Sequence, residues 1–167
     1  MQRWWAHNNY NACDKKFKND IAIIKFSDSL KLPTLTNNGY GSINTACHPN
    51  KNTHGNQATL SGWGRFNTNN NQNSKVLRTV NVPVWSLSDC KNKWDVDDSQ
   101  ICAGGNAGEN SCMGDSGGPL VTYYNKVAYV IGLSSYGPNQ CAQKGIPNVF
   151  TKVSYFNDWI NNIVNNN

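Results

Sequence analysis

The chain has 167 residues, enough for one domain with a substantial core. Its formal net charge is +5, but the 15 lysines and arginines are scattered, which argues against a nucleic-acid-binding arm. No run of 18 apolar residues occurs, so no transmembrane helix is predicted.

Six cysteines in a chain of this length indicate an oxidising compartment and disulfide bonds. Their spacing does not resemble a zinc site, so neither a metal nor a cofactor is predicted. The first residues, Met1–His7, contain no apolar stretch and therefore no recognisable signal peptide. Disulfide bonds imply export, but the chain shows no export signal. We therefore expect that sequence before Met1 is missing.

The first predicted element is a short strand over Asn19–Phe26, a β-branched run that begins with the acidic residue Asp20. Residues 33–56 are rich in Asn, Gly, Thr and Pro and show no periodicity, which is typical of a connector. The asparagine-rich patches Asn67–Asn73 and Asn161–Asn167 are expected to be a solvated loop and tail.

The second part of the chain predicts an all-β barrel or sandwich, because short strand-like runs alternate there with turn residues. Ser86 is expected to cap a short helix over 88–93. A C-terminal helix is predicted because apolar residues recur on one face of it. The predicted strands are 57–63, 75–84, 100–103, 118–124, 126–135 and 147–153, and the helix face comprises Val153, Phe156, Trp159, Ile160 and Ile163.

The most informative stretch is Ser111–Leu120, with the sequence Ser-Cys-Met-Gly-Asp-Ser-Gly-Gly-Pro-Leu. Ser116 lies between an aspartate and two glycines. Glycines clear space around its hydroxyl and allow backbone N–H groups to gather around a small anion. These features are typical of a nucleophile beside an oxyanion hole.

This string resembles the nucleophile segment of the chymotrypsin/trypsin-like serine proteases. Asp20–Lys25, with the sequence Asp-Ile-Ala-Ile-Ile-Lys, is similar to the family strand that carries the catalytic aspartate. Asp20 and Ser116 are 96 residues apart, against roughly 93 in the family template. The resemblance extends from about His7 to Val164.

The resemblance implies a chymotrypsin-like fold. Residues 1–32 would be the last strands of an incomplete N-terminal barrel, and 33–56 the connector between barrels. A complete six-stranded Greek-key barrel would follow over 57–153, with a C-terminal helix and tail over 154–167.

The resemblance also implies catalytic roles for Asp20 and Ser116, with an oxyanion hole made by the N–H groups of Gly114 and Ser116. Asp115 would pair with the α-amino group that appears when a zymogen is cut. The template places the general base, a histidine, roughly 45 residues before the aspartate, but only 19 residues precede Asp20. The family's Thr-Ala-Ala-His-Cys string is absent, so the chain alone is expected to be inactive.

None of the three histidines is predicted to replace that base. His7 falls in a surface segment, and His48 and His54 fall in the connector.

By the same resemblance, Asn110 falls at the base of the specificity pocket, where trypsin-like members place Asp. Asn148 replaces a glycine of the wall and should shorten the pocket, while Gly137 leaves its mouth open. We therefore expect a polar, restricted pocket and cleavage after non-basic residues, although the neighbouring Glu109 complicates this expectation. An alternative is that Asn110 and Asn148 bond to each other and bind nothing. The implied pocket comprises Asn110, Ser111, Met113, Ser135, Tyr136, Gly137 and Asn148, with the backbone of Ser135–Gly137 open to a substrate strand.

Family positions imply the disulfides Cys90–Cys102 and Cys112–Cys141. A third family bridge would join the positions of Ala58 and Thr122, and both of its cysteines are absent. Cys47 matches a position that bridges to a propeptide in some relatives. It either pairs with a segment outside this chain or with Cys13.

The first functional hypothesis is the C-terminal portion of a secreted serine endopeptidase, a monomer when complete. Its partners would be protein or peptide substrates and protease inhibitors, with no nucleic acid and no membrane. The alternative is a catalytically dead homologue that acts as a binding or regulatory module. A third hypothesis is a β-barrel binding module unrelated to proteases.

Overall fold

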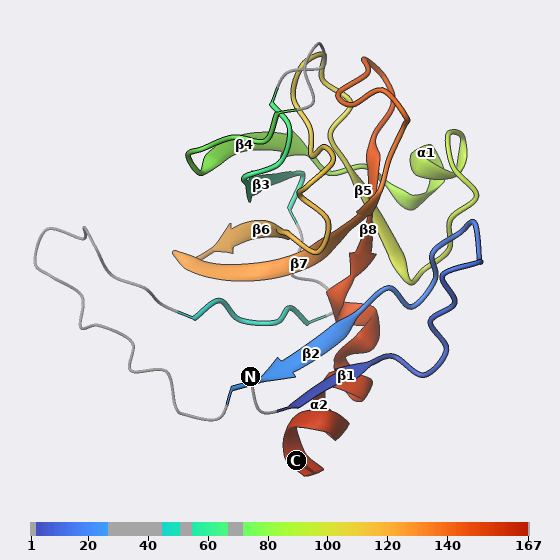
Figure 1. Cartoon of the computed structure of the whole chain (residues 1–167), viewed down its shortest axis with the longest axis vertical. Helices are drawn as coiled ribbons and strands as arrows, with labels where there is room; N and C mark the ends of the chain where they lie inside the picture. The colour runs from blue at the N-terminus through green and yellow to red at the C-terminus, as the bar shows by residue number, and fades with distance from the viewer. Residues whose placement is uncertain (1–2, 27–44, 51–54, 67–71, 167) are drawn as a thin grey trace, which may run out of the picture.

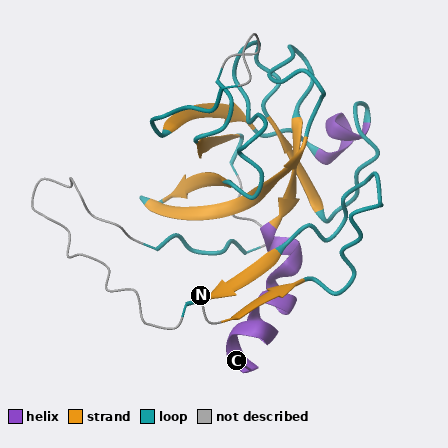
Figure 2. Cartoon of the chain, viewed as in Figure 1, coloured by secondary structure: helices purple, strands orange, loops and turns teal. Residues whose placement is uncertain are grey.

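The computed structural model describes residues 3–26, 45–50, 55–66 and 72–166. Strands dominate it, and helices occupy two short stretches of the described chain (Figure 2). The strands form a two-stranded and a six-stranded sheet.

The six-stranded sheet has the order β4-β3-β6-β7-β8-β5, and all of its pairings are antiparallel (Figure 1). A bridge between Val84 and Ala103 joins its two edges, so the sheet curls into a barrel. This confirms the predicted all-β fold. The strands are β3 (Gln57–Gly62), β4 (Arg78–Pro83), β5 (Gln100–Ala103), β6 (Pro119–Tyr124), β7 (Val127–Tyr136) and β8 (Asn148–Lys152).

The hairpin between β6 and β7 shows how local sequence builds this sheet. Asn125 and Lys126 have φ angles of 49° and 64° and separate the two strands. A two-residue turn with two positive φ angles matches the twist of the flanking strands, and asparagine tolerates this conformation well. The register of β6 and β7 therefore starts at the Tyr124–Val127 pair.

The core lies inside the barrel and is aliphatic and aromatic. Alternate residues of the strands point into it, as the period of two requires. Leu120, Val82 and Phe150 are fully buried there. The core cluster consists of Ala58, Leu60, Val82, Ile101, Ala103, Leu120, Ile131 and Phe150.

Helix α1 spans Leu87–Lys91, within three residues of its predicted bounds at each end. As predicted, Ser86 caps it, since its hydroxyl accepts a hydrogen bond from the N–H of Asp89 at 3.0 Å. The predicted C-terminal helix divides into a 3₁₀ turn, η1 (Val153–Phe156), and the helix α2 (Asn157–Asn166).

The N-terminal part forms a separate sheet in which β1 (Arg3–Ala6) pairs with β2 (Ala22–Lys25). The sequence did not predict β1, and β2 is shorter than the predicted strand. This sheet lies along α2 (Figure 1), where His7 contacts the rings of Phe156 and Trp159. The predicted boundary between residues 32 and 33 lies outside the described residues.

The connector returns to the barrel at Cys47, which pairs with β7 in a parallel bridge to Tyr129. The carbonyl of Pro49 accepts a hydrogen bond from Asn157 at 2.8 Å. Cys47 and Cys13 are both exposed, and neither forms a disulfide bond within the described chain.

Within the described ranges, no helix is long and apolar enough to cross a membrane. The same residues contain no group of three or more His, Cys, Asp or Glu side chains arranged for a metal ion.

Candidate active site

Ser116 is exposed and lies in a turn between two glycines with positive φ, 95° at Gly114 and 76° at Gly117. Glycine adopts this conformation without the strain that other residues would incur. The N–H of Gly117 donates to the carbonyl of Ser134 at 2.7 Å, which fastens the turn to β7. Within the described chain, the N–H groups of Gly114 and Ser116 have no acceptor.

Asp20 lies just before β2 and contacts the barrel through both its side chain and its backbone. Its carboxylate accepts a hydrogen bond from the Ser135 hydroxyl at 2.7 Å, and its carbonyl accepts one from Thr151 at 2.8 Å. Ser135 and Ser116 line the same cavity, of about 170 Å³. Ser135 thus connects Asp20, to which it donates a hydrogen bond, with the cavity that Ser116 lines.

The histidines in the described part of the chain do not connect Asp20 with Ser116. His7 packs between Phe156 and Trp159, at ring-centre distances of 5.4 and 5.2 Å. Its Nδ1 atom accepts a hydrogen bond from the N–H of Asn9 at 3.3 Å. His48 is exposed, and His54 lies outside the described residues. Among the residues that the structure places, no histidine is bonded to Ser116 or Asp20.

Asp115 points inward, away from the turn that carries Ser116. Its two carboxylate oxygens accept hydrogen bonds from the N–H groups of Gly64 at 2.7 Å and Cys112 at 3.0 Å. A Cβ at Gly62 or Gly64 would collide with the carboxyl group, so the Gly-Trp-Gly sequence permits this approach.

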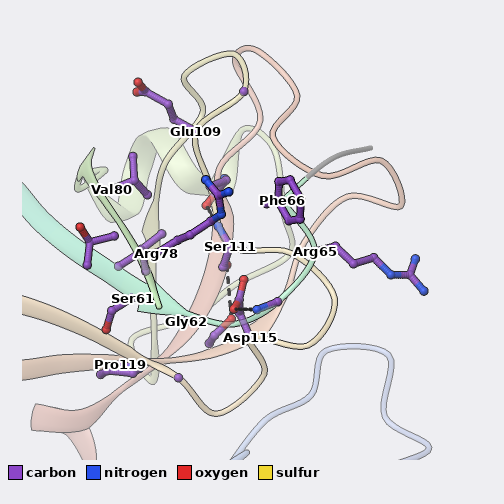
Figure 3. A pocket seen from close by; sticks show the side chains of 17 residues that line it. Ser61, Gly62, Arg65, Phe66, Arg78, Val80, Glu109, Ser111, Asp115 and Pro119 are labelled. Carbon is purple, nitrogen blue, oxygen red and sulfur yellow. Dashed lines mark hydrogen bonds between the residues drawn. The ribbon is translucent and has the colours of Figure 1, made fainter. Parts of the chain in front are cut away.

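The Asp115 carboxylate borders a second cavity, of about 270 Å³. In Figure 3 the carboxylate lies near Gly62 and Ser111, and the Arg65 side chain extends away from it. A carboxylate facing a cavity of this kind suits a cationic group.

Asn148 forms part of the wall of the cavity beside Ser116. Its Nδ2 atom donates to the carbonyl of Ser111 at 2.9 Å and to the Ser111 hydroxyl at 2.7 Å. Its side chain passes beneath Gly137, where a Cβ would collide with Oδ1.

Asn110 does not line the cavity beside Ser116, although the family positions predicted it at the base of that pocket. Its Oδ1 atom accepts the N–H of Ser111 at 2.9 Å, which turns the amide against Gly104. Asn110 lines the cavity beside Asp115. The two amides therefore bond to Ser111 and not to each other.

The remaining pocket residues form its wall and rim. Met113 is exposed, and Tyr136 is half-buried. Burial raises the pKa of the Tyr136 phenol, which accepts a hydrogen bond from Gln100 at 3.3 Å. The disulfide Cys112–Cys141 joins two sides of the cavity, and Cys90–Cys102 joins α1 to β5.

Sequence reasoning missed two features of this site. It did not identify Ser135 as the partner of Asp20, although it placed Ser135 in the pocket. It also gave Gly62 and Trp63 only as the end of the predicted strand 57–63, whereas Gly62 and Gly64 border the Asp115 carboxylate. Two glycines flanking one aromatic residue at a strand end were the available signal.

The chain matches the family model described as Trypsin over residues 1–160. It is 34% identical to the CLIP domain-containing serine protease B4 of Anopheles gambiae, over 93% of this chain and 44% of that protein. It is 39% identical to brachyurin of Leptuca pugilator, over 93% of this chain and 64% of that protein. It is also 40% identical to glucanase inhibitor protein 3 of Phytophthora sojae, over 62% of this chain and 76% of that protein. The chain thus spans less than half of the CLIP-domain relative and less than two thirds of brachyurin.

Proposed function

Because the chain belongs to the trypsin-like serine protease family, we propose that it is the C-terminal portion of a secreted serine endopeptidase. The observation that carries this proposal is that Ser135, which donates a hydrogen bond to the Asp20 carboxylate, lines the same cavity as Ser116. A general base would come from sequence outside this chain. The short span relative to the protease relatives supports this division.

In the complete enzyme, Ser116 is the nucleophile. A histidine oriented by Asp20 takes the Ser116 proton while the hydroxyl oxygen bonds to the substrate carbonyl carbon. The N–H groups of Gly114 and Ser116 receive the negative charge that develops on the carbonyl oxygen. The histidine then protonates the leaving amine, and water hydrolyses the acyl-enzyme.

Asp115 supports activation in this proposal. A newly cut chain end carries an ammonium group, which would enter the cavity beside the Asp115 carboxylate. Because Asp115 directly precedes Ser116, this ion pair would fix the turn that presents Gly114 and Ser116.

The chain alone is expected to be inactive. In a related triad enzyme, loss of the catalytic histidine lowers kcat by roughly 10⁶-fold.

A fluorophosphonate probe, which labels activated serines, tests this assignment. The natural full-length protein, after activation, should be labelled at Ser116, and its Ser116→Ala variant should not. The chain alone should label no faster than the alanine variant. Failure of the activated full-length protein to label would contradict the proposal, and so would rapid labelling of the chain alone.

The second candidate is an inactive homologue that acts by binding, supported by the likeness to glucanase inhibitor protein 3. The coding sequence before Met1 distinguishes the two candidates. An in-frame Thr-Ala-Ala-His-Cys-like string favours the protease, whereas inhibition of an endoglucanase by the purified protein favours the homologue.

Protein or peptide substrates follow from the protease proposal, as does the backbone of Ser135–Gly137 as the surface that pairs with an extended substrate. Disulfides in the structure support export to an oxidising compartment. We propose a monomer for the complete protein, with protease inhibitors as further partners.

A further inference from the structure

We propose that Asn148 makes the cavity beside Ser116 select a short, uncharged substrate side chain, best the carboxamide of asparagine or glutamine. This inference rests on the proposed function, because it names the substrate residue that precedes the cut bond.

The orientation of the Asn148 amide is fixed by its surroundings. The residue begins β8 and is 6% exposed. Its nitrogen must face Ser111, because the Ser111 backbone carbonyl can only accept a hydrogen bond. The oxygen therefore faces Gly137, whose missing side chain leaves room for it. The amide spans the cavity from one wall to the other.

The size and charge of the cavity exclude long basic side chains. Its volume is about 170 Å³, below the roughly 300–1,000 Å³ of sites for drug-sized ligands. None of the described residues that line it carries a charge at neutral pH. A lysine or arginine side chain would lose its water there without gaining a counter-ion. The lining comprises Ser111, Cys112, Met113, Ser116, Ser134, Ser135, Tyr136, Gly137, Pro138, Asn139, Cys141 and Asn148.

The polar atoms of the cavity complement a carboxamide. Asn148 Oδ1 is buried and has no hydrogen-bond partner among the described residues, so it needs a donor. Ser111 Oγ accepts from Asn148 at 2.7 Å and from Ser134 at 3.3 Å, and within the described chain its own hydrogen has no acceptor. Both atoms belong to residues that line the cavity, so a side chain that reaches them meets one acceptor and one donor.

A primary carboxamide presents the matching pair, since its NH₂ group donates and its carbonyl accepts. A serine or threonine hydroxyl would satisfy only part of this pair. A leucine side chain would leave Asn148 Oδ1 unsatisfied. The expected order of preference is therefore carboxamide, then hydroxyl, then aliphatic, with cationic side chains last.

Peptide binding tests the inference without requiring catalysis. The ¹⁵N-labelled chain is titrated with the carboxylate peptides acetyl-Ala-Ala-Ala-X, where X is Gln, Asn, Leu or Lys. The Gly137 backbone and Asn148 side-chain resonances report occupancy. We expect Gln or Asn peptides to bind about 3- to 10-fold more tightly than the Leu peptide, the range for one neutral hydrogen bond. The Lys peptide should bind most weakly.

Variants test whether the preference for the Gln peptide depends on Asn148. Asn148→Gly should bring the Gln and Leu peptides to equal affinity, whereas Asn161→Ala, at an exposed position of α2 that does not line the cavity, should leave the preference unchanged. Asn148→Asp replaces the amide by a carboxylate of the same shape and should raise the affinity for the Lys peptide. The peptide series on the unmodified chain remains decisive if a variant fails to fold.

Equal binding of the Gln and Leu peptides to the unmodified chain would overturn the inference, as would a Gln preference that survives in Asn148→Gly. Absence of binding by every peptide would overturn it too. The proposed function is tested separately by labelling. A full-length protein that is labelled but cuts after lysine contradicts the inference alone. Failure of labelling beside Gln-selective binding contradicts the proposed function alone.

Discussion

At the scale of single residues, Asp115 carries a structural role that its neighbour Ser116 does not share. Both Asp115 oxygens accept backbone N–H groups, from Gly64 and Cys112. Ser116 is exposed, and its hydroxyl makes no hydrogen bond to any described residue. Two adjacent residues of one motif therefore separate into a structural anchor and an available nucleophile.

The first prediction is that Asp115→Asn lowers the free energy of unfolding by about 1–3 kcal/mol. The variant replaces one acceptor oxygen by an NH₂ group that faces a backbone N–H, and an unsatisfied buried donor costs about this amount. Urea unfolding followed by fluorescence measures the change. Ser116→Ala is the control and should stay within about 0.5 kcal/mol of the unmodified chain. An Asp115→Asn variant as stable as this control would contradict the anchor role.

At the scale of elements, the loop that follows β3 depends on the absence of a side chain at Gly64. A Cβ at Gly64 would collide with the Asp115 carboxylate, whereas one at Gly55 would meet, among the residues that the structure describes, only Thr122 Oγ1, at 3.9 Å. Both glycines lie outside the strands, and neither has a positive φ.

These two glycines form a matched pair for the second prediction. Gly64→Ala should lower the free energy of unfolding by about 2 kcal/mol or more, because a collision with the half-buried, hydrogen-bonded Asp115 carboxylate strains the site. Gly55→Ala should be neutral or slightly stabilising, since alanine restricts the unfolded chain. Thermal and urea unfolding of both variants provide the measurement. Equal effects of the two substitutions would show that the loop moves aside easily.

The two disulfides contribute to different elements, which yields the third prediction. Cys90–Cys102 closes 12 residues and Cys112–Cys141 closes 29, so loop-closure entropy gives about 3 and 4 kcal/mol. Replacing either pair by alanines should destabilise the chain by up to this amount. Only loss of Cys112–Cys141, which lines the cavity beside Ser116, should also weaken binding of the Gln peptide. Equal weakening in both double variants would contradict this division.

Sequence patterns predicted the elements better than the orientations of their side chains. The strands of the barrel follow β-branched runs between turn residues, and Ser86 marked the start of α1. Arg3–Ala6 carries no such pattern, and it becomes a strand because β2 pairs with it. Family positions placed Asn110 at the base and Asn148 on the wall of one pocket. Their directions depend on which groups of Ser111 each amide meets in space.

At the scale of the whole molecule, two ion pairs attach the segment before β2 to the barrel. Lys16 pairs with Asp95 and Lys18 pairs with Asp97, across the face beside α1. The Phe17 ring contacts Tyr136 at a ring-centre distance of 5.5 Å. Because Asp20 directly follows this segment, these contacts hold the aspartate beside Ser135.

Asp97 makes this attachment sensitive to acid, which is the fourth prediction. Burial opposes ionisation of Asp97, but hydrogen bonds from Lys18 and Ser99 outweigh it and lower the pKa to about 2. A lowered folded-state pKa stabilises the fold above the ordinary value near 4, and this contribution is lost as the pH falls from about 4 through about 2. Since the carboxylate is 43% exposed, we reduce the expected contribution to about 1 kcal/mol for solvent screening.

Urea unfolding between pH 6 and pH 2 measures this contribution as the difference between the unmodified chain and Asp97→Asn. The difference should be about 1 kcal/mol at pH 6 and should fall to a small fraction of that value near pH 2, because the carboxyl group is then protonated in the unfolded state and about half protonated in the folded state. Asp98→Asn alters an exposed neighbouring carboxylate and serves as the control, which should stay within about 0.5 kcal/mol of the unmodified chain at pH 6. A difference that persists unchanged at pH 2 would mean that Asp97 acts through packing, and the segment that positions Asp20 would then be held without the aid of charge.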